Sequence, residues 1–279
     1  MTALQQNDHR RDAAGLTYVY PVLSRRAGGV SVGINLNPNN ACNWHCVYCQ
    51  VPDLVRGSAP AIDVALLEHE LRGFLDELVH GDYLARHLPE GQREVRDIAF
   101  SGNGEPTSAR GFDEIVARVI AIRDAAGLAA VPLRLITNGS LIGRAGVQCG
   151  VARLGAAGGE VWFKVDAGKA ADIERINGVA LSPGKVSRSL ARCAALAPTW
   201  VQTCLFAWDG EAPGDAQIEA YLACLEAAGM ASLAGVLLYG VARPSMQPEA
   251  PRVTALSPQR LDAIAQRIKE KGLTVRVSP

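Results

Sequence analysis

The sequence has no long apolar run. No stretch of about 18 uncharged apolar residues occurs among its 279 residues, so the chain gives no sign of a membrane-spanning helix. The first residues, MTALQQNDHRRDAAG, carry charges but no apolar core, and they therefore lack the central part of an export signal. From these absences we expect a cytoplasmic protein without a membrane partner.

The sequence also lacks an excess of charge of either sign. Its 28 Lys and Arg residues balance 28 Asp and Glu residues, which leaves no basic excess of the kind that binds nucleic acid along a whole chain. A nucleic-acid partner would therefore need a local basic patch. With 48% hydrophobic residues, the chain is long enough to bury a sizeable core.

A clear hydrophobic period is missing from the first part of the chain. Residues 1–30 carry two arginine pairs, Arg10–Arg11 and Arg25–Arg26, which we expect to be solvated. We interpret this part as an N-terminal extension that lies over the surface, and residues 31–279 as one domain.

The seven cysteines do not suit a disulfide framework, because their number is odd and a reducing cytoplasm disfavours disulfides. Three of them crowd into the segment CNWHCVYC, at Cys42, Cys46 and Cys49. The others sit singly in apolar sequence, where a cysteine is usually a small buried hydrophobic residue. These are Cys149, Cys193, Cys204 and Cys224.

Short apolar runs alternate with amphipathic segments from residue 31 onward. The runs predicted as strands are 31–37, 97–102, 133–139, 161–166, 200–207 and 235–241, with a terminal run at 273–278. The segments predicted as helices are 63–80, 112–127, 144–156, 184–197, 214–228 and a last one that begins at the Ser257–Pro258 cap.

Six main strands separated by helical crossovers predict parallel pairing through right-handed βα units. The pattern does not separate an open doubly wound sheet from a complete or partial barrel. In each of these folds the loops that follow the strands share one edge, and ligands bind at that edge. We therefore look for functional residues at strand ends.

The cysteine triple directly follows the first of these strands. Three thiolates from one loop can hold three corners of a [4Fe–4S] cube and leave one iron without a protein ligand, so that this iron takes an outside ligand. Two alternatives remain open. His45 could complete a Cys3His zinc site, although zinc ribbons normally bring two separated ligand pairs. The cysteines could also be clustered structural residues.

Two later strand ends carry small and polar residues. In SGNGEPT, the glycines allow a close approach of backbone to a ligand, and Glu105 is kept out of helical geometry by Pro106. In ITNGS, Thr137 and Asn138 supply short polar groups before a glycine. Ordinary turn chemistry would explain both segments equally well.

Charged residues end the strand in VWFKVDAG. A period of two places Trp162, Lys164 and Asp166 on one face, opposite three apolar residues. If the apolar face packs on helices, Lys164 and Asp166 point inward together. Opposite charges inside a barrel should be paired or functional, whereas on a bare sheet edge they would be ordinary surface charges.

Two further features follow later in the chain. Gln202 and Cys204 share one face of their strand. The segment YGVARPSMQPEAP is rich in proline and predicts a stiff, irregular loop, in which Arg243 could anchor an anionic ligand. A simple loop cap is the alternative interpretation.

The segment CNWHCVYC resembles the signature of the radical S-adenosylmethionine (radical SAM) enzymes, with three cysteines separated by three and then two residues and an aromatic residue before the last. The GEP element, the TNG strand end and the K-x-D-A strand occur in the order typical of these enzymes. KVDA and ARPS resemble the group related to wyosine-base formation. Over roughly residues 31–245, the resemblance implies a partial (β/α)6 TIM-like barrel of parallel strands with an N-terminal extension.

The resemblance also implies a cofactor site. Cys42, Cys46 and Cys49 would bind a [4Fe–4S] cluster whose free iron is chelated by the methionine part of S-adenosylmethionine (SAM). The remaining residues that the resemblance assigns to SAM share positions at strand ends or in the cysteine segment. They are Tyr48 near the adenine, Gly104, Glu105 and Pro106 at the amino group, Thr137 and Asn138 at the ribose or carboxylate, and Lys164 or Asp166 facing SAM or substrate.

The reaction implied by the resemblance is reductive cleavage of SAM to a 5'-deoxyadenosyl radical that abstracts hydrogen from an unidentified substrate. An electron donor such as a flavodoxin or ferredoxin would reduce the cluster. A tRNA substrate is disfavoured, because the chain has no second cysteine group and no basic excess. The alternatives are activation of a glycyl-radical protein, modification of a peptide, or, outside enzymes, a protein that only holds an Fe–S cluster or zinc.

Overall fold

A curved, largely parallel sheet forms the inside of the molecule. The computed structural model describes residues 14–24 and 29–278, and within these ranges the sheet contains nine strands. In spatial order they are β1 (Val19–Ser24), β2 (Gly29–Ile34), β5 (Val95–Phe100), β6 (Leu133–Thr137), β7 (Glu160–Lys164), β8 (Thr199–Trp208), β9 (Gly235–Gly240) and β11 (Val275–Ser278), with β10 (Val253–Ala255) paired to β8. Strands β1 and β10 run antiparallel to their neighbours.

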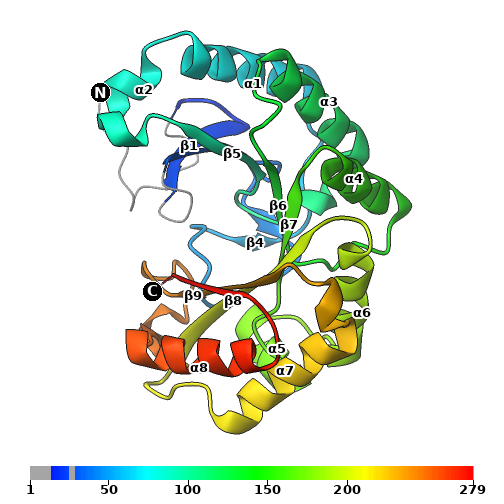
Figure 1. Ribbon diagram of the computed structural model, residues 1–279, viewed down its shortest axis with the longest axis vertical. Helices are drawn as coiled ribbons and strands as arrows, with labels where there is room; N and C mark the ends of the chain where they lie inside the picture. The colour runs from blue at the N-terminus through cyan, green and yellow to red at the C-terminus, as the bar shows by residue number, and fades with distance from the viewer. Residues whose placement is uncertain (1–13, 25–28, 279) are drawn as a thin grey trace.

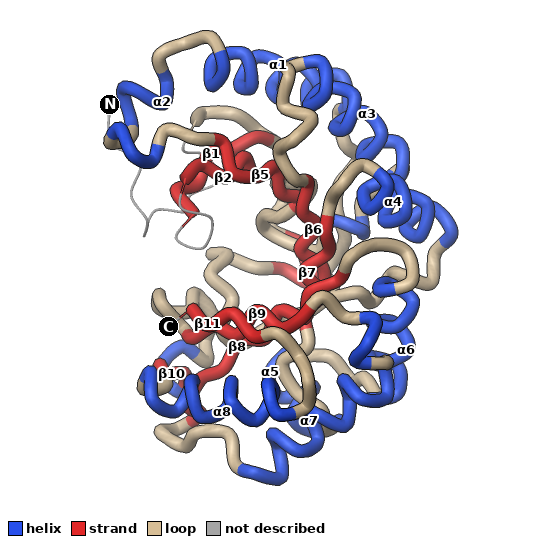
Figure 2. Tube along the Cα trace, in the orientation of Figure 1, coloured by secondary structure: helices blue, strands red, loops and turns tan. Residues whose placement is uncertain are grey.

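Helices cover the convex side of the sheet, as Figures 1 and 2 show. They are α1 (Val64–Val79), α2 (Tyr83–His87), α3 (Phe112–Ala125), α4 (Ala145–Ala156), α5 (Ala170–Asn177), α6 (Pro183–Ala194), α7 (Asp215–Ala228) and α8 (Pro258–Glu270). The ribbon forms a letter C, and in the described part of the sheet the edge strands β1 and β11 do not pair with each other. The expected partial barrel of parallel strands is therefore confirmed.

Local sequence explains why these helices form and pack where they do. In α1, the Asp63 side chain accepts a hydrogen bond from the backbone N–H of Leu66 at 3.0 Å and so caps the helix. Leu67, Leu71 and Leu75 recur at helical spacing and are fully buried against the sheet. Burial of each such side chain contributes about 1.5–3 kcal/mol to stability.

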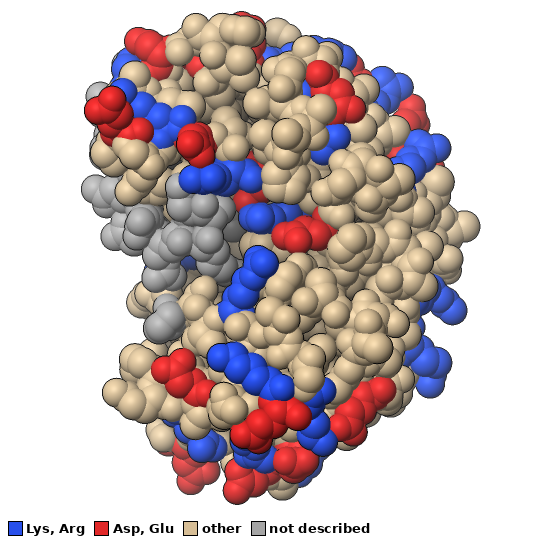
Figure 3. Space-filling view, in the orientation of Figure 1, with Lys and Arg blue, Asp and Glu red and all other residues tan. Residues whose placement is uncertain are grey.

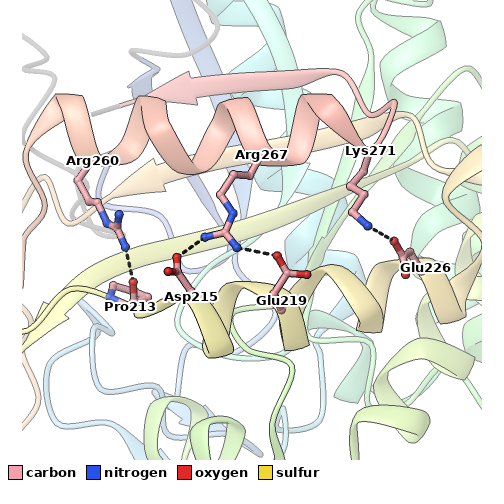
Figure 4. Close-up of polar contacts among 7 residues, drawn as sticks. All are labelled: Pro213, Asp215, Glu219, Glu226, Arg260, Arg267 and Lys271. Atoms are coloured by element: carbon pink, nitrogen blue, oxygen red, sulfur yellow. Dashed lines mark hydrogen bonds and ion pairs between the residues drawn. The ribbon is translucent and has the colours of Figure 1, made fainter.

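The last helix holds the end of the chain against the barrel. Figure 4 shows Arg267 of α8 pointing toward α7, where it pairs with Asp215 and Glu219 at 2.6 Å each. Lys271, directly after α8, pairs with Glu226 of α7 at 2.7 Å. These pairs are exposed, and each contributes less than about 1 kcal/mol. Helix α8 itself packs on the core through Leu261, Ile264 and Ile268, and β11 follows it alongside β9 in parallel register.

Alternation along the strands separates an outer core from the inside of the curve. Val161 and Phe163 of β7 face the helices and are buried in the main core, as the period of two predicts. The intervening residues face the lumen in successive layers. From the amino ends of the strands upward, these layers contain Asp97, Arg134 and Glu160, then Ile136, Trp162 and Trp200, then Lys164, Gln202 and Tyr239.

Part of residues 1–30, which we interpreted as a surface extension, belongs to the sheet. Residues 19–24 form β1, and Val19 and Tyr20 are at most 2% exposed. Strand β1 is covered on both sides, because Val19 packs in the main core while the Tyr20 ring lies across Gly33. It therefore shows no polar–apolar alternation. The predictions for the two arginine pairs lie outside the described residues.

Two other expectations need correction. Cys193, Cys204 and Cys224 are buried as predicted, but Cys149 is exposed on the outer side of α4. Strand β7 ends at Lys164 rather than continuing to residue 166, so the period of two does not extend to Asp166. The consequences for the site are described below.

Candidate functional site

The cysteine segment forms a loop at the carboxyl end of β2. It begins in a small parallel sheet, in which β3 (Ala41–Cys42) pairs with β4 (Val55–Arg56). Backbone N–H groups of His45 and Val47 donate to carbonyls of Asn177 and Ile176, at 3.0 and 2.9 Å. The loop is therefore held by backbone hydrogen bonds at the C-terminal end of α5, far away in the sequence.

A cavity of about 230 Å³ lies beneath this loop, at the top of the lumen. It brings together most of the predicted site residues, namely Cys42, Cys46, Cys49, Tyr48, Gly104, Glu105, Asn138 and Lys164. It is also lined by residues that sequence reasoning did not assign to the site, among them Trp44, Ser101, Gln202 and Tyr239. The predicted meeting of several strand ends at one place is thus observed.

Asp166, Thr137 and Pro106 do not line this cavity. Asp166 is 6% exposed, and its Oδ1 accepts a hydrogen bond from the backbone N–H of Cys204 at 2.9 Å. Its Oδ2 accepts hydrogen bonds from the Tyr48 hydroxyl and from Asn177 Nδ2, at 2.5 and 2.7 Å. Asp166 therefore anchors the cysteine loop to the barrel wall.

Asn177 connects this anchor with one of the cysteines. Its Nδ2 also donates to Cys46 Sγ at 3.4 Å. On the other side of the loop, the backbone N–H of Trp44 donates to Cys42 Sγ at 3.5 Å. Donors of this kind orient a thiolate ligand and stabilise its negative charge. The contribution of Asn177 has no local signal in the sequence.

The GEP turn packs directly against the cysteine loop. A Cβ atom on Gly104 would lie 2.0 Å from the carbonyl oxygen of Ala41, so only glycine allows this approach. The buried carboxylate of Glu105 accepts hydrogen bonds from Thr107 Oγ1, Thr137 Oγ1 and the Asn138 N–H at 2.5, 2.6 and 2.7 Å. Burial raises the pKa of Glu105, and these donors oppose that effect. Glu105 and Thr137 thus fix the turn on β6.

Asn138 links the end of β6 to the cysteine loop. Its Nδ2 donates to Asn43 Oδ1 at 2.9 Å, and Asn43 Nδ2 in turn donates to Ser140 Oγ at 2.7 Å. The Asn138 side chain is therefore already engaged with the protein while it lines the cavity. This pairing explains why a polar residue follows β6 at this position.

The proline-rich loop after β9 clamps the other side of the cysteine loop. Ser245 Oγ donates to the carbonyl of Val47 at 2.7 Å, and Gln247 Nε2 donates to the carbonyls of Cys49 and Val51 at 3.2 and 2.8 Å. The carbonyl of Arg243 accepts a hydrogen bond from Gln50 at 3.3 Å. The loop after β9 therefore holds the cysteine loop in place through side chains that donate to its backbone carbonyls. The proline content of the sequence alone did not predict this role.

Electrostatics in the cavity favour neutral thiols and a charged lysine. Burial raises the pKa of Cys42 to about 11 and that of Cys46 to about 12. Burial also acts to lower the pKa of Lys164, but Tyr239 and Asp166 outweigh it and hold the pKa above its ordinary value. The Lys164 ammonium donates to the Tyr239 hydroxyl at 3.2 Å and lies 4.9 Å from the centre of the Tyr48 ring.

A [4Fe–4S] cluster and a zinc ion place different demands on the side chains that bind them. Among the residues that the structure describes, no group of three or more His, Cys, Asp or Glu side chains is gathered around one ion position. A zinc ion needs such a gathering, because its thiolate bonds are about 2.3 Å long. A [4Fe–4S] cube instead takes one thiolate at each of several separated irons. Three thiols that line one cavity match the three protein ligands of such a cube, and metal analysis decides between the cube and zinc.

Two buried polar atoms beside the cavity lack hydrogen-bond partners among the described residues. They are Nε1 of Trp44 and Oε1 of Gln202, on side chains that are each 4% exposed. An unpartnered buried polar atom costs about 1–3 kcal/mol, so such atoms mark places where a bound molecule would supply the missing partner. Both residues line the cavity under the cysteine loop, which therefore fits a polar cofactor.

Charged side chains of both signs are interspersed on the face drawn in Figure 3. Within the described ranges, no helix combines the length and apolar character needed to cross a membrane.

No model of a known protein family matches the chain. Among curated proteins, GTPase Obg of Brachyspira hyodysenteriae is 30% identical over 122 residues, which is 44% of this chain and 15% of that protein. Because the match spans so small a part of that protein, its name carries no activity over to this chain.

Solved structures give a likeness that covers most of the chain. SuiB of Streptococcus suis, bound to S-adenosylmethionine, is 11% identical with a TM-score of 0.60, over 91% of this chain and 52% of SuiB. TYW1 with a lysine-pyruvate adduct is 13% identical with a TM-score of 0.59, over 95% of this chain and 78% of that one. A radical SAM methyltransferase from Sphaerobacter thermophilus is 17% identical with a TM-score of 0.61, over 93% and 68%.

At such identities the likeness is one of fold, and this chain spans only about half the length of SuiB. Taken with the position of the cysteine loop above the lumen, these comparisons establish that the chain has the partial-barrel fold of the radical SAM enzymes.

Proposed function

We propose that the protein is a radical SAM enzyme that holds a [4Fe–4S] cluster on Cys42, Cys46 and Cys49 and cleaves SAM reductively. The observation that carries the proposal is the cavity of about 230 Å³ that all three cysteines share with the GEP turn, Gln202 and Lys164. The partial-barrel fold supports it, because the loops at the carboxyl ends of parallel strands are where such folds bind ligands.

When bound, the cluster would supply the electron that splits SAM into methionine and a 5'-deoxyadenosyl radical. The protein's own contribution is to fix and enclose the reactants. Two sets of contacts hold the cysteine loop. Ser245 and Gln247 donate hydrogen bonds to its carbonyls, and Tyr48 of the loop donates to Asp166. Such rigid support keeps ligands at productive distances.

The polar groups of the cavity can orient the cofactor. The backbone of the GEP turn and the unpartnered atoms of Trp44 and Gln202 offer hydrogen bonds to the amino acid and nucleoside parts of SAM. Lys164, a cation inside the lumen, would select the anionic end of a ligand. An electron donor such as a flavodoxin or ferredoxin completes the proposed reaction.

Anaerobic reconstitution tests the proposal. The protein is loaded with iron and sulfide, reduced with dithionite and incubated with SAM, and 5'-deoxyadenosine and methionine are measured by mass spectrometry. We expect about four irons per chain and formation of both products. Intact SAM in the presence of a reduced cluster would instead favour a protein that only holds the cluster, and zinc in place of iron would favour the Cys3His alternative.

The exposed cysteine of α4 offers a matched control. Replacement of Cys46 by serine removes a thiol from the cavity, whereas Cys149→Ser removes an exposed thiol outside it. We expect Cys46→Ser to abolish cluster binding and SAM cleavage and Cys149→Ser to leave both unchanged. Equal loss in the two variants would count against the assignment of the cluster to this cavity.

A further inference from the structure

Helices α4 and α6 carry basic but no acidic side chains. The two helices are neighbours on the outside of the barrel (Figure 1), where a Cβ atom on Gly155 of α4 would lie 2.8 Å from Cβ of Ala197, just after α6. Asp and Glu supply 28 of the 279 residues of the chain, yet residues 139–159 and 178–198 contain neither. Both helices and their flanking loops therefore present positive charge without acidic residues of their own.

Three of these cations, which we call the α6 stripe, share one face of α6. Lys185, Arg188 and Arg192 are spaced by three and then four residues, so they line the helix over about 10 Å. All three are exposed, and among the described residues none has a carboxylate within ion-pair distance. On the neighbouring helix α7, Glu219 and Glu226 pair with cations of α8 and its end instead. The charge of the α6 stripe is therefore available to a partner.

The segment that leads into α6 lies directly against the cysteine loop. A Cβ atom on Gly178, where α5 ends, would lie only 2.7 Å from the carbonyl oxygen of His45. The exposed guanidinium of Arg56 joins the two segments, because it donates to the carbonyls of both Gly178 and Asn43. Arg56 thus adds a fourth cation between the cysteine loop and the start of α6.

The far end of the α6 stripe approaches the cysteine loop from another side. A Cβ atom on Gly143 would lie 3.6 Å from Nη1 of Arg192, so this guanidinium is beside the loop that follows β6. The same loop contains Ser140, which accepts a hydrogen bond from Asn43 Nδ2 at 2.7 Å. Asn43 follows Cys42 directly, and the stripe therefore borders the segment assigned to the cluster.

Two exposed apolar side chains also adjoin the cysteine loop. Among the described residues only four large hydrophobic side chains are exposed, and two of them are Val55 and Met246, at 52% and 56%. Val55 pairs with Ala41, next to Cys42, and the backbone N–H of Met246 donates to the carbonyl of Cys49 at 2.9 Å. A small apolar area with charged residues beside it is the usual composition of a protein–protein interface.

We propose that the α6 stripe, together with Arg56, Val55 and Met246, is the docking surface of an acidic electron-transfer protein that reduces the proposed cluster. This inference rests on the proposed function, because the docked donor loses one electron and the cluster gains it. Cations without carboxylate partners attract a surface of opposite charge and raise the rate of encounter. Electron-transfer complexes have small interfaces, and a stripe of about 10 Å beside two apolar residues is of that size.

A nucleic acid is the other anionic macromolecule that a basic surface could bind. Nucleic-acid-binding proteins commonly neutralise about 6–10 phosphates, whereas the α6 stripe offers three cations with Arg56 beside them. The exposed side chains of Val55 and Met246 would gain nothing from a phosphate backbone. The arrangement therefore favours an acidic protein.

Binding of an acidic flavodoxin and of an acidic [4Fe–4S] ferredoxin to the reconstituted protein tests the proposal. Biolayer interferometry with the oxidised donors measures association at low and at high salt, and it requires no turnover. We expect at least one donor to bind, with an association rate that falls as the salt concentration rises. Replacement of all three residues of the α6 stripe by glutamate should slow association at low salt by about tenfold or more.

A matched pair of single variants separates the α6 stripe from net charge. Arg188→Glu and Lys269→Glu change the charge of the protein by the same amount. Lys269 lies on α8, is exposed and likewise has no carboxylate within ion-pair distance in the described part of the chain. We expect Arg188→Glu to slow association several-fold and Lys269→Glu to change it little. Equal slowing in the two variants would overturn the assignment of the docking surface to α6.

Absence of binding by both donors, or unchanged association in the triple variant, would also overturn the docking surface. Binding of bulk transfer RNA that the triple variant loses while it still binds the donor would replace the acidic protein by a nucleic acid. If the triple variant does not fold, Arg188→Glu carries the test.

SAM cleavage driven by dithionite keeps the two proposals separate, because this small reductant needs no docking surface. The cleavage should be the same in the wild type and in all the charge variants. Cleavage without donor binding refutes only the docking surface. Donor binding that depends on the α6 stripe, without cleavage, refutes only the proposed enzyme activity.

Discussion

The hydroxyl of Tyr48 donates a hydrogen bond of 2.5 Å to the carboxylate of Asp166, which lies 118 residues later in the chain. Burial and the Asp166 carboxylate raise the pKa of Tyr48 well above its ordinary value, so the phenol stays protonated and remains a donor. The contact ties the cysteine loop to the segment between β7 and α5. It makes the geometry of the thiols depend on a residue outside their own loop.

Replacement of Tyr48 by phenylalanine should loosen this loop. The variant leaves a buried carboxylate with one donor fewer, which costs about 1–3 kcal/mol in the free energy of unfolding. We expect a lower midpoint of urea unfolding and a reduced iron content after reconstitution. Tyr221→Phe is the matched control, because that buried hydroxyl bonds Thr203 at 2.8 Å away from the cysteines. It should lose similar stability yet retain its iron, and iron loss in both variants would argue against a specific anchor.

Gly104 should not tolerate alanine. The added Cβ would lie 2.0 Å from the carbonyl oxygen of Ala41, so the GEP turn or the cysteine loop has to move. We expect a loss of about 1–3 kcal/mol in unfolding free energy and weaker binding of SAM in equilibrium dialysis. The control is Gly73→Ala inside α1, where a Cβ meets nothing within 4 Å. This change should stabilise the protein by about 0.5–1 kcal/mol, and comparable losses in both variants would contradict the explanation.

The sequence predicts those features of the site that depend on a pattern among neighbouring residues. The α1 helix follows from Asp63 and leucines at helical spacing, and the inward direction of Lys164 follows from alternation along β7. Alternation does not fix the direction of Asp166, because the strand stops at Lys164. Strand β1 was missed because it is buried on both faces and includes Pro21, so it lacks the usual strand pattern.

The residues that support the cysteine loop could not be predicted at all from their own surroundings. Asn177 reaches Cys46 across 131 residues, and Gln247 reaches the Cys49 carbonyl across 198. Their function arises only when the strand ends meet in the folded barrel. A polar residue at a helix end or in a proline-rich loop has ordinary local explanations, and these hide its contact with a distant segment.

Gln202 should show opposite effects on stability and binding. Its Oε1 is buried without a hydrogen-bond partner among the described residues, so Gln202→Met should raise the free energy of unfolding of the cofactor-free protein by about 1 kcal/mol. The same change removes a polar contact from the cavity and should weaken SAM binding several-fold. Gln217→Met makes a suitable comparison, because Gln217 has partners in Gly214 and Asp172. That variant should lose stability and keep its SAM affinity.

Asn177 should set the reduction potential of the proposed cluster. Its Nδ2 donates to Cys46 Sγ at 3.4 Å, and a donor to a ligand sulfur stabilises the more negative, reduced state. A hydrogen bond of about 0.5–1.5 kcal/mol corresponds to roughly 20–60 mV for a one-electron couple. We therefore expect Asn177→Leu to lower the potential by that amount in a redox titration followed by electron paramagnetic resonance.

Asn177 also donates to Asp166 at 2.7 Å, so its replacement could change the potential simply by disturbing the anchor. The Tyr48→Phe variant separates these effects, because it removes a donor from the same carboxylate oxygen but none from a cysteine. If the hydrogen bond to sulfur sets the potential, Asn177→Leu lowers it and Tyr48→Phe changes it little. An equal decrease in both variants would mean that loop position, and not the donor to Cys46, controls the electron affinity of the site.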